Sequence, residues 1–140
     1  MIIVDTGFLY ALVDARDVWH ERALAQAGTA AQGWVTTWPV LTEATHLMTR
    51  RLGASFAAAL MDDAADGGFQ VWAPPPEQVA RIPALMRRYA NLPMDLADAS
   101  LVLLAEHLGH GRILSTDQRD FRSYRFKSRK PFSNLLGTTP

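Results

Sequence analysis

Short apolar runs, separated from one another by helical patterns, constrain the fold of this chain more than any other feature. Purely apolar runs occupy residues 2–4 and 113–114, and two further short runs with the composition of strands occupy residues 34–37 and 69–72. Each run is too short for a helix and is typical of a strand, whereas the segments between them place apolar residues at helical spacing. The expected helices cover residues 8–13, 17–31, 54–66 and 77–89, and further helices open at Trp38 and after Pro93. Strands that alternate with helices predict an α/β domain with a mainly parallel sheet.

Length and composition predict a single folded domain. The chain has 140 residues, of which 49% are hydrophobic, and this content argues against disorder. We therefore expect one domain over residues 1–140, with an edge strand near residues 124–126 and a flexible tail over residues 133–140.

Several kinds of protein are excluded by what the sequence lacks. Without cysteine it has no disulfides, no thiol chemistry and no cysteine-ligated zinc. It contains neither GxxxxGK[ST] nor GxGxxG, which argues against nucleotide binding. No apolar run is long enough to span a membrane and the first residues lack the basic start of a secretion signal, so we expect a cytoplasmic protein.

Two aspartates directly follow predicted strands. Asp5 comes after the first apolar run and Asp117 comes shortly after the last one. In parallel α/β sheets, ligands bind at the carboxyl ends of the strands, which is where these carboxylates are expected. Taken alone, Asp5 is better explained as a turn aspartate that caps the next helix.

Other acids lie on helix faces that are otherwise apolar. Glu43 falls on the apolar stripe of the helix that opens at Trp38, and Asp98 shares a face with Leu101 in the later helix. Asp95 lies one turn before Asp98 over the same face. An inward carboxylate without a partner is costly, so these positions call for a cation.

The acids together predict a site for a hard divalent cation. Clustered carboxylates repel one another and raise one another's pKa unless a cation lies between them. Mg²⁺ and Mn²⁺ prefer carboxylate and water oxygens, and they are the expected ions. Zinc is a poorer expectation because His46, His107 and His110 show no zinc-binding spacing.

A basic segment near the C-terminus is a candidate for binding nucleic acid. The net charge is zero, so the total gives no support for this function. Aromatic side chains interleave with the basic ones, which suits phosphate contacts and base stacking. A solvated edge with aromatics in the core explains the pattern equally well. The candidate phosphate contacts are Arg119, Arg122, Arg125 and Lys127.

The ordered set of acids and their surroundings resembles the PIN-domain family, in particular its VapC-type toxin ribonucleases. The matching segments are MIIVDTGFLYALVD, PVLTEATHLM, DLADASLVLLAEHLG and ILSTDQRDF, so the resemblance runs from residue 1 to about residue 126. It implies a three-layer α/β/α sandwich. It also implies an acidic site formed by Asp5, Glu43, Asp98 and Asp117.

The resemblance also implies a reaction and partners. The expected activity is cleavage of RNA phosphodiester bonds with Mg²⁺ or Mn²⁺. Asp5 and Asp98 are the expected principal ligands, Asp117 completes the shell, and Glu43 holds a second ion or a bound water, as a possible general base. The expected partners are RNA, an antitoxin protein that covers the metal site, and a second copy of the chain in a homodimer.

Three further residues have expected supporting roles. Asp95 is either a helix cap or an additional acid at the rim of the site. Thr6 and Thr116 adjoin the acids and are expected to orient carboxylates or to hold a water.

Two other functional classes remain as alternatives. The first is phosphoryl transfer on a small molecule, because Asp5 after the first strand also suits a haloacid-dehalogenase-type phosphatase or a receiver-like protein. The phosphatase would need a second aspartate where Gly7 stands, and the receiver would need a late lysine that is not evident. The second alternative is a non-catalytic binding module, which leaves the inward acids unexplained.

Overall fold

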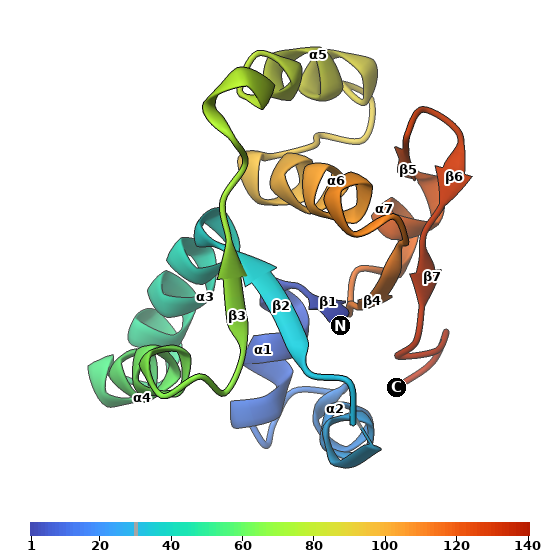
Figure 1. Ribbon diagram of the computed structural model, residues 1–140. Helices are drawn as coiled ribbons and strands as arrows, with labels where there is room; N and C mark the ends of the chain where they lie inside the picture. The colour runs from blue at the N-terminus through green and yellow to red at the C-terminus, as the bar shows by residue number, and fades with distance from the viewer. Residues whose placement is uncertain (30) are drawn as a thin grey trace.

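The computed structural model describes residues 1–29 and 31–140. In this part of the chain, helices separate successive strands as far as β4, and shorter elements follow (Figure 1). The elements are β1 (Ile2–Val4), α1 (Thr6–Val13), α2 (His20–Thr29), β2 (Trp34–Thr37), α3 (Trp38–Arg51), α4 (Ala54–Ala65), β3 (Gln70–Trp72), the 3₁₀ turn η1 (Pro76–Gln78), α5 (Arg81–Arg88), α6 (Leu96–Leu108), β4 (Arg112–Leu114), α7 (Gln118–Ser123), β5 (Arg125–Phe126), β6 (Lys130–Pro131) and β7 (Ser133–Asn134).

The main sheet is parallel, as predicted. Its strand order is β3-β2-β1-β4-β7, and each pairing between neighbours is parallel. Ile3 lies at the centre, opposite Val35 on one side and Ile113 on the other. Figure 1 shows α5 and α6 above this sheet and α1 and α2 below it. The predicted three-layer α/β/α architecture is therefore confirmed.

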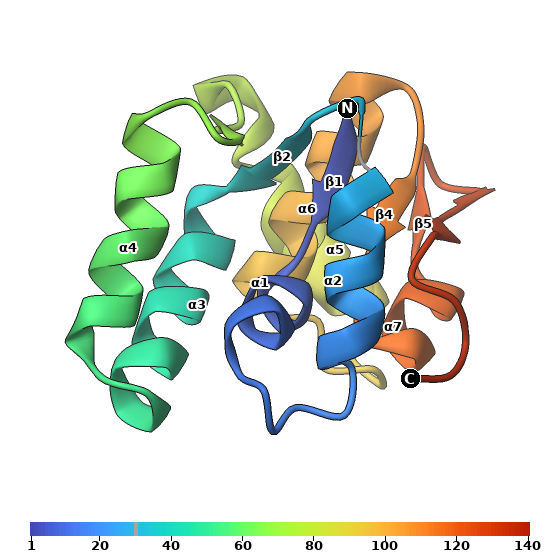
Figure 2. The ribbon, with the colours of Figure 1, turned by 90° about the horizontal axis from the view of Figure 1, so that it is seen from below.

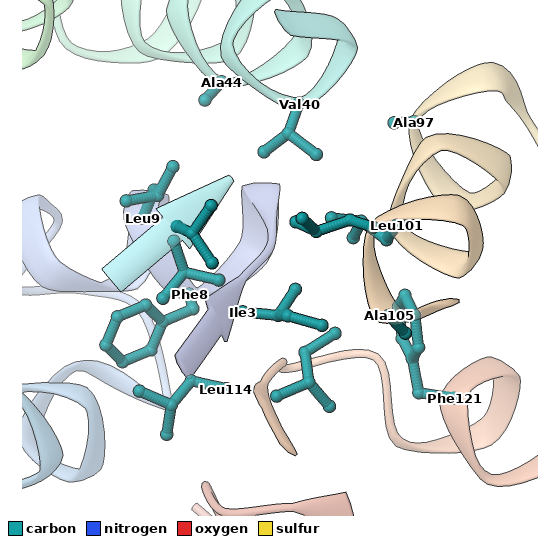
Figure 3. Packing of buried hydrophobic residues seen from close by; sticks show 14 of the residues in the cluster. Ile3, Phe8, Leu9, Val40, Ala44, Ala97, Leu101, Ala105, Leu114 and Phe121 are labelled. Carbon is teal, nitrogen blue, oxygen red and sulfur yellow. The ribbon is translucent and has the colours of Figure 1, made fainter. Parts of the chain in front are cut away.

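The core is built where α1, α3 and α6 meet the central strand. Figure 3 shows Phe8 of α1, Val40 of α3 and Leu101 of α6 surrounding Ile3. All of these side chains are at most 1% exposed. Burying a side chain of this size contributes about 1.5–3 kcal/mol, so the packing holds the central strand firmly against the helices. The residues that follow β1 and β4 are consequently fixed at one edge of the sheet.

The C-terminal segment is not the flexible tail that we expected. Ser133 and Asn134 form β7, which pairs with β4, and Leu136 is completely buried. The Ser133 amide donates to the Gly111 carbonyl at 2.8 Å, and the Leu135 amide donates to the Ile113 carbonyl at 2.7 Å. A strand this short has too few residues to show an alternating pattern, which is why it escaped prediction.

Most expected elements agree with the structure to within two residues, and three differ more, in their pairing, their continuity or their extent. Residues 125–126 do form a strand, but it pairs antiparallel with β6 as a separate ribbon rather than at the edge of the main sheet. The helix expected over residues 77–89 divides into η1 and α5, because Pro83 has no amide to donate to the Val79 carbonyl. The helix expected over residues 17–31 covers His20–Thr29, and residue 30 lies outside the described residues.

Within the described part of the chain, the helices are all too short or too polar to cross a membrane.

Candidate active site

An acidic cavity of about 340 Å³ lies at the carboxyl ends of β1 and β4, beside the start of α6. It is lined by every acid that the sequence predicted and by both predicted threonines: Asp5, Thr6, Glu43, Asp95, Asp98, Thr116 and Asp117. Asp120, which was not predicted, also lines it and lies one turn after Asp117. The fold therefore brings together acids from widely separated segments of the chain.

Asp5 is the most deeply placed of these acids. Its side chain is 7% exposed, and its Oδ1 accepts a hydrogen bond of 2.9 Å from the Phe8 amide, which caps α1. Its Oδ2 accepts a hydrogen bond from the Ser115 hydroxyl. Burial raises the pKa of Asp5 to about 7, against the opposing effect of these hydrogen bonds, and the charges of Asp117 and Glu43 raise it further. At neutral pH this carboxyl is consequently divided between its protonated and ionised forms unless a cation is present.

Asp117 is connected to Asp5 through Ser115. The Asp117 amide donates to the Ser115 hydroxyl oxygen at 2.9 Å, while the same hydroxyl donates to Asp5. Asp117 Oδ1 caps α7 by accepting from the Asp120 amide at 3.1 Å. Burial also raises the pKa of the Asp117 carboxyl. Ser115 is fully buried and was not predicted, although its position between a buried strand and an acid is a signal that could have identified it.

Asp95 and Asp98 form a reciprocal cap at the start of α6. The Asp98 amide donates to Asp95 Oδ1 at 2.8 Å, and the Asp95 amide donates to Asp98 Oδ2 at 3.4 Å. The same Asp98 oxygen accepts from the Tyr124 hydroxyl at 3.2 Å. Burial raises the pKa of Asp98 to about 8, and the charge of Asp95 adds to this effect. Asp95 is thus a helix cap that also lines the cavity, so both interpretations of this residue apply.

Glu43 projects from α3 and lines the cavity, but its side chain is exposed, so the expectation that it lies on the buried stripe of the helix is wrong. Partial desolvation raises its pKa, the Thr6 hydroxyl opposes this effect, and the charge of Asp95 reinforces it. The Thr6 hydroxyl also donates to the Val40 carbonyl at 3.4 Å. Glu43 and Asp95 therefore form a pair of neighbouring negative charges.

Thr116 packs against the start of α1. A Cβ placed on Gly7 would lie 1.9 Å from the Thr116 hydroxyl oxygen, so only glycine leaves room for this side chain. This contact joins the segment that follows β1 to the segment that follows β4. An aspartate at position 7, as a phosphatase of the haloacid-dehalogenase type would need, would displace the Thr116 side chain from this position.

The chemistry of these side chains suits a hard divalent cation. They offer carboxylate oxygens around a cavity with space for an ion, waters and a phosphate group. Among the residues that the structure describes, however, no three Asp, Glu or His side chains already form a cluster that could hold a metal ion. The donors therefore fit such a cation in kind, and binding would require their side chains to move toward one another.

The predicted phosphate contacts lie in two different places. Arg119 and Arg122 are exposed on α7, the helix that Asp117 caps. The Lys127 amide is held by Glu106, which is eight residues and about 12 Å further along α6 than Asp98. In Figure 2 the ribbon that contains β5 lies toward the end of the molecule that carries the N-terminus, whereas α7 lies toward the opposite end. Lys127 is consequently remote from the acids.

Arg125 and the neighbouring aromatic residues have structural contacts. The Arg125 guanidinium donates to the carbonyls of Arg122 and Tyr124 at 2.8 and 2.9 Å. Phe121, Tyr124 and Phe126 are at most 4% exposed. Their rings pack edge to face with one another or with Phe132. The suggestion that these aromatics stack on bases is therefore wrong for the buried rings, and the alternative that they belong to the core is correct.

Comparison with known proteins identifies the family to which the chain belongs. Residues 2–127 match the family model of the PIN domain. The chain is 29% identical over 127 residues to ribonuclease VapC26 of Mycobacterium tuberculosis, a match that covers 89% of this chain and 92% of the relative. Its fold is similar to the crystal structure of VapC20 of Mycobacterium tuberculosis, described as a sarcin–ricin loop cleaving toxin. That similarity has a TM-score of 0.78 at 22% identity and covers 85% of this chain and 92% of the other. The predicted resemblance is thus confirmed, and this chain belongs to the PIN domain family.

Proposed function

We propose that this protein is a VapC-type ribonuclease that cleaves RNA phosphodiester bonds at the acidic cavity and depends on Mg²⁺ or Mn²⁺. The observation that carries the proposal is the convergence of Asp5, Glu43, Asp98 and Asp117 on one cavity. The ribonuclease relative and the PIN domain match support the type of reaction.

In this proposal the carboxylates share the binding of the cation. Asp5 and Asp98 are the principal ligands, Asp117 completes the shell, and Glu43 holds a second ion or a bound water. When bound, the cation lowers the pKa of a water and neutralises charge on the scissile phosphate. The raised pKa values of Asp5 and Asp98, about 7 and about 8, mean that both carboxyls release protons near neutral pH as the cation binds.

Glu43 is the candidate for general base. Its side chain is exposed to the cavity and to solvent, so it can take up a proton and pass it to water. The pKa of Glu43 is raised toward neutral pH, and a carboxylate with such a pKa is a better general base. Thr116, held against Gly7, and Thr6 are proposed to position a water or a carboxylate oxygen beside it.

Arg119 and Arg122 are the proposed contacts for phosphates next to the cleaved bond. They lie on α7, whose first turn is capped by a cavity acid, and they face solvent. Lys127 is proposed to contact a phosphate further along the strand, because its amide is held near the far end of α6. Arg125, whose guanidinium is bonded to the Arg122 and Tyr124 carbonyls at the end of α7, is proposed to contact a phosphate between these two positions. The arginines would offset the repulsion between RNA and the acidic cavity.

The proposal includes protein partners and a location. A cognate antitoxin would cover the acidic cavity, and two copies of the chain would form a homodimer. Exposed apolar side chains that could serve such contacts include Trp38, 53% exposed, and Phe56, 40% exposed. A cytoplasmic location follows from an RNA substrate. Light scattering of the purified protein, alone and with the antitoxin, tests both associations.

The central test is RNA cleavage by the purified protein with Mg²⁺, with Mn²⁺ and with EDTA. Asp5→Asn and Asp98→Asn are each expected to abolish most of the activity that the metal supports. Asp62→Asn, an exposed acid on α4 away from the cavity, is the matched control and should cleave like the wild type. Activity that survives both EDTA and the two cavity substitutions would refute the metal-dependent ribonuclease.

A further inference from the structure

The side chain of Asn134, in β7, binds the end of β4 immediately before the acidic cavity. Its Oδ1 accepts from the Ser115 amide at 3.2 Å, and its Nδ2 donates to the Ser115 carbonyl at 2.9 Å. Oδ1 also accepts from the Leu136 amide at 3.1 Å. The amide group of Asn134 is therefore hydrogen-bonded to both backbone groups of one residue.

That residue, Ser115, is the one that joins two of the cavity acids. Its hydroxyl donates to Asp5 Oδ2 and accepts from the Asp117 amide. Ser115 is completely buried, so no water competes for its backbone or its hydroxyl. A continuous chain of hydrogen bonds thus leads from Asn134 through Ser115 to Asp5 and Asp117.

Asparagine suits this position because its side chain carries both a donor and an acceptor. Backbone pairing between β4 and β7 ends with the bond from the Leu135 amide to the Ile113 carbonyl. The Asn134 side chain continues the pairing to Ser115, as a neighbouring strand would. An alanine offers neither group, and an aspartate offers only acceptors.

β7 has attachments to the domain besides the hydrogen bonds of Asn134. β7 is already held by the backbone bonds of Ser133 and Leu135 and by the fully buried side chain of Leu136. The Asn134 side chain forms its additional hydrogen bonds with the backbone of Ser115. Their main effect is therefore on the orientation of the residue that contacts the acids.

We propose that Asn134 is a positioning residue of the acidic site, which acts through Ser115 to hold Asp5 and Asp117 in place. This inference rests on the proposed ribonuclease function. It concerns a residue beyond the stretch, residues 2–127, that matches the PIN domain family. It therefore assigns a role in the site to the C-terminal strand.

A double-mutant cycle tests this role. Asn134→Ala is expected to lower kcat for RNA cleavage about ten- to a hundredfold, the usual cost of losing a group that orients a metal ligand, with little change in KM. Ser115→Ala should have a similar effect. Because Asn134 acts through Ser115, the double variant should lose little more than the worse single variant. Ser133→Ala, an exposed neighbour in β7, is the matched control and should retain the wild-type kcat.

Two results of the cycle would overturn the inference. One is a double variant whose loss equals the product of the single losses, because independent effects multiply. The other is a rise in KM at unchanged kcat. Asn134→Asp keeps the size of the side chain but replaces the donor to the Ser115 carbonyl with an acceptor, so it should lower kcat at least as much as Asn134→Ala. It serves as the second variant if Asn134→Ala does not fold.

Amide hydrogen exchange separates this inference from the proposed function. In either Asn134 variant, the Asp117 amide, which donates to the Ser115 hydroxyl, should exchange about five- to tenfold faster than in the wild type. Amides between β2 and β3 should be unaffected. If the wild type cleaves no RNA, the proposed function fails while this measurement still decides the role of Asn134. An Asp117 amide that exchanges at the wild-type rate in a folded variant would overturn it.

Discussion

The acids that follow strands and the acids on helices line the same cavity but are held in different ways. Asp5 and Asp117 accept hydrogen bonds from the first turns of α1 and α7 and share Ser115. Asp95 and Asp98 mainly bind each other's amides, and neither they nor Glu43 forms a salt bridge within the described residues. The strand side of the cavity, formed by Asp5 and Asp117, is fixed by the sheet, whereas the helix side, formed by Glu43, Asp95 and Asp98, consists of neighbouring carboxyl groups that a cation would draw together.

This difference shows that capping a helix and binding a cation are compatible roles for one carboxylate. Asp5, Asp95 and Asp117 each accept from an amide in the first turn of a helix. Helix N-termini carry partial positive charge, so the cavity acids face the ends of α1, α6 and α7 that favour anions. A carboxylate oxygen has lone pairs left after one such bond, so the cap fixes the ligand without consuming it.

The largest expected effects are on the rate of RNA cleavage when one acid that follows a strand and one acid on a helix are replaced. Asp5→Asn removes a fixed ligand and should lower kcat about a thousandfold with Mg²⁺. Glu43→Gln removes a solvent-exposed base and should lower kcat about a hundredfold. Single-turnover cleavage measures both, with Asp62→Asn as the control. A greater loss of kcat for Glu43→Gln than for Asp5→Asn would mean that the exposed acid on the helix contributes more to cleavage than the buried acid after the strand.

The next effect is on stability without metal. The pKa of Asp5 is raised from 3.8 to about 7, so the folded protein binds this proton more tightly than the unfolded chain. The resulting stabilisation is present below about pH 4 and is lost as the pH rises to 7. Asp5→Asn should therefore exceed the wild type in free energy of unfolding by about 1–3 kcal/mol at pH 8, and by little at pH 4.

Denaturant unfolding in EDTA at a series of pH values measures this difference. Glu43→Gln, at an exposed position, should change the free energy of unfolding by less than about 0.5 kcal/mol at either pH. Equal effects of the two substitutions at pH 8 would show that Asp5 is no more desolvated than Glu43.

A smaller effect is expected from the hydroxyl group of Tyr124. Tyr124→Phe keeps the buried ring but removes the donor to Asp98 Oδ2 and to the Leu92 carbonyl. Cleavage should fall about tenfold and the free energy of unfolding by about 1 kcal/mol. Tyr89→Phe is the matched control, because its hydroxyl accepts from the Arg125 amide at 3.0 Å and does not contact the acids. Unchanged cleavage by Tyr124→Phe would mean that Asp98 keeps its position without this bond.

The smallest effect concerns the basic residues. Arg122→Gln should weaken RNA binding and reduce the slope of log K against log salt by about 0.7, because one phosphate contact is lost. Lys127→Gln should reduce the slope less with short RNA, since the Lys127 amide is held by Glu106, far along α6 from Asp98. Binding to catalytically inactive Asp5→Asn protein at several salt concentrations provides the measurement. An equal loss for both variants with short RNA would place Lys127 as near to the substrate as Arg122.

The parts of the molecule with regular patterns were predictable from the sequence. β1 and the end of β4 are short apolar runs, and α3 and α6 carry apolar stripes among which the acids Glu43 and Asp98 stand out in the sequence. Burial against the sheet makes such patterns necessary, so the parallel sheet and the acids that gather at its edge could be anticipated.

The residues that support the acids could not be predicted in the same way. Ser115 and Asp5 are 110 positions apart, and Asn134 and Ser115 are 19 apart. Hydrogen bonds across such separations leave no periodic signal. The turn between β5 and β6 depends on positive φ angles of 48° and 67° at Lys127 and Ser128, residues in which that conformation is uncommon. β7 was missed because its pairing depends on the completed fold.

The absence of a side chain at Gly7 has a practical consequence. Any larger residue there would compete with the Thr116 hydroxyl for the same space, so the Thr116 side chain, which lines the cavity beside Asp117, would have to leave its position. Gly7→Ala thus offers a way to disarm the protein while every carboxylate remains in the chain. Such a variant would permit safe expression for isolating natural binding partners whose recognition depends on the acidic side chains themselves.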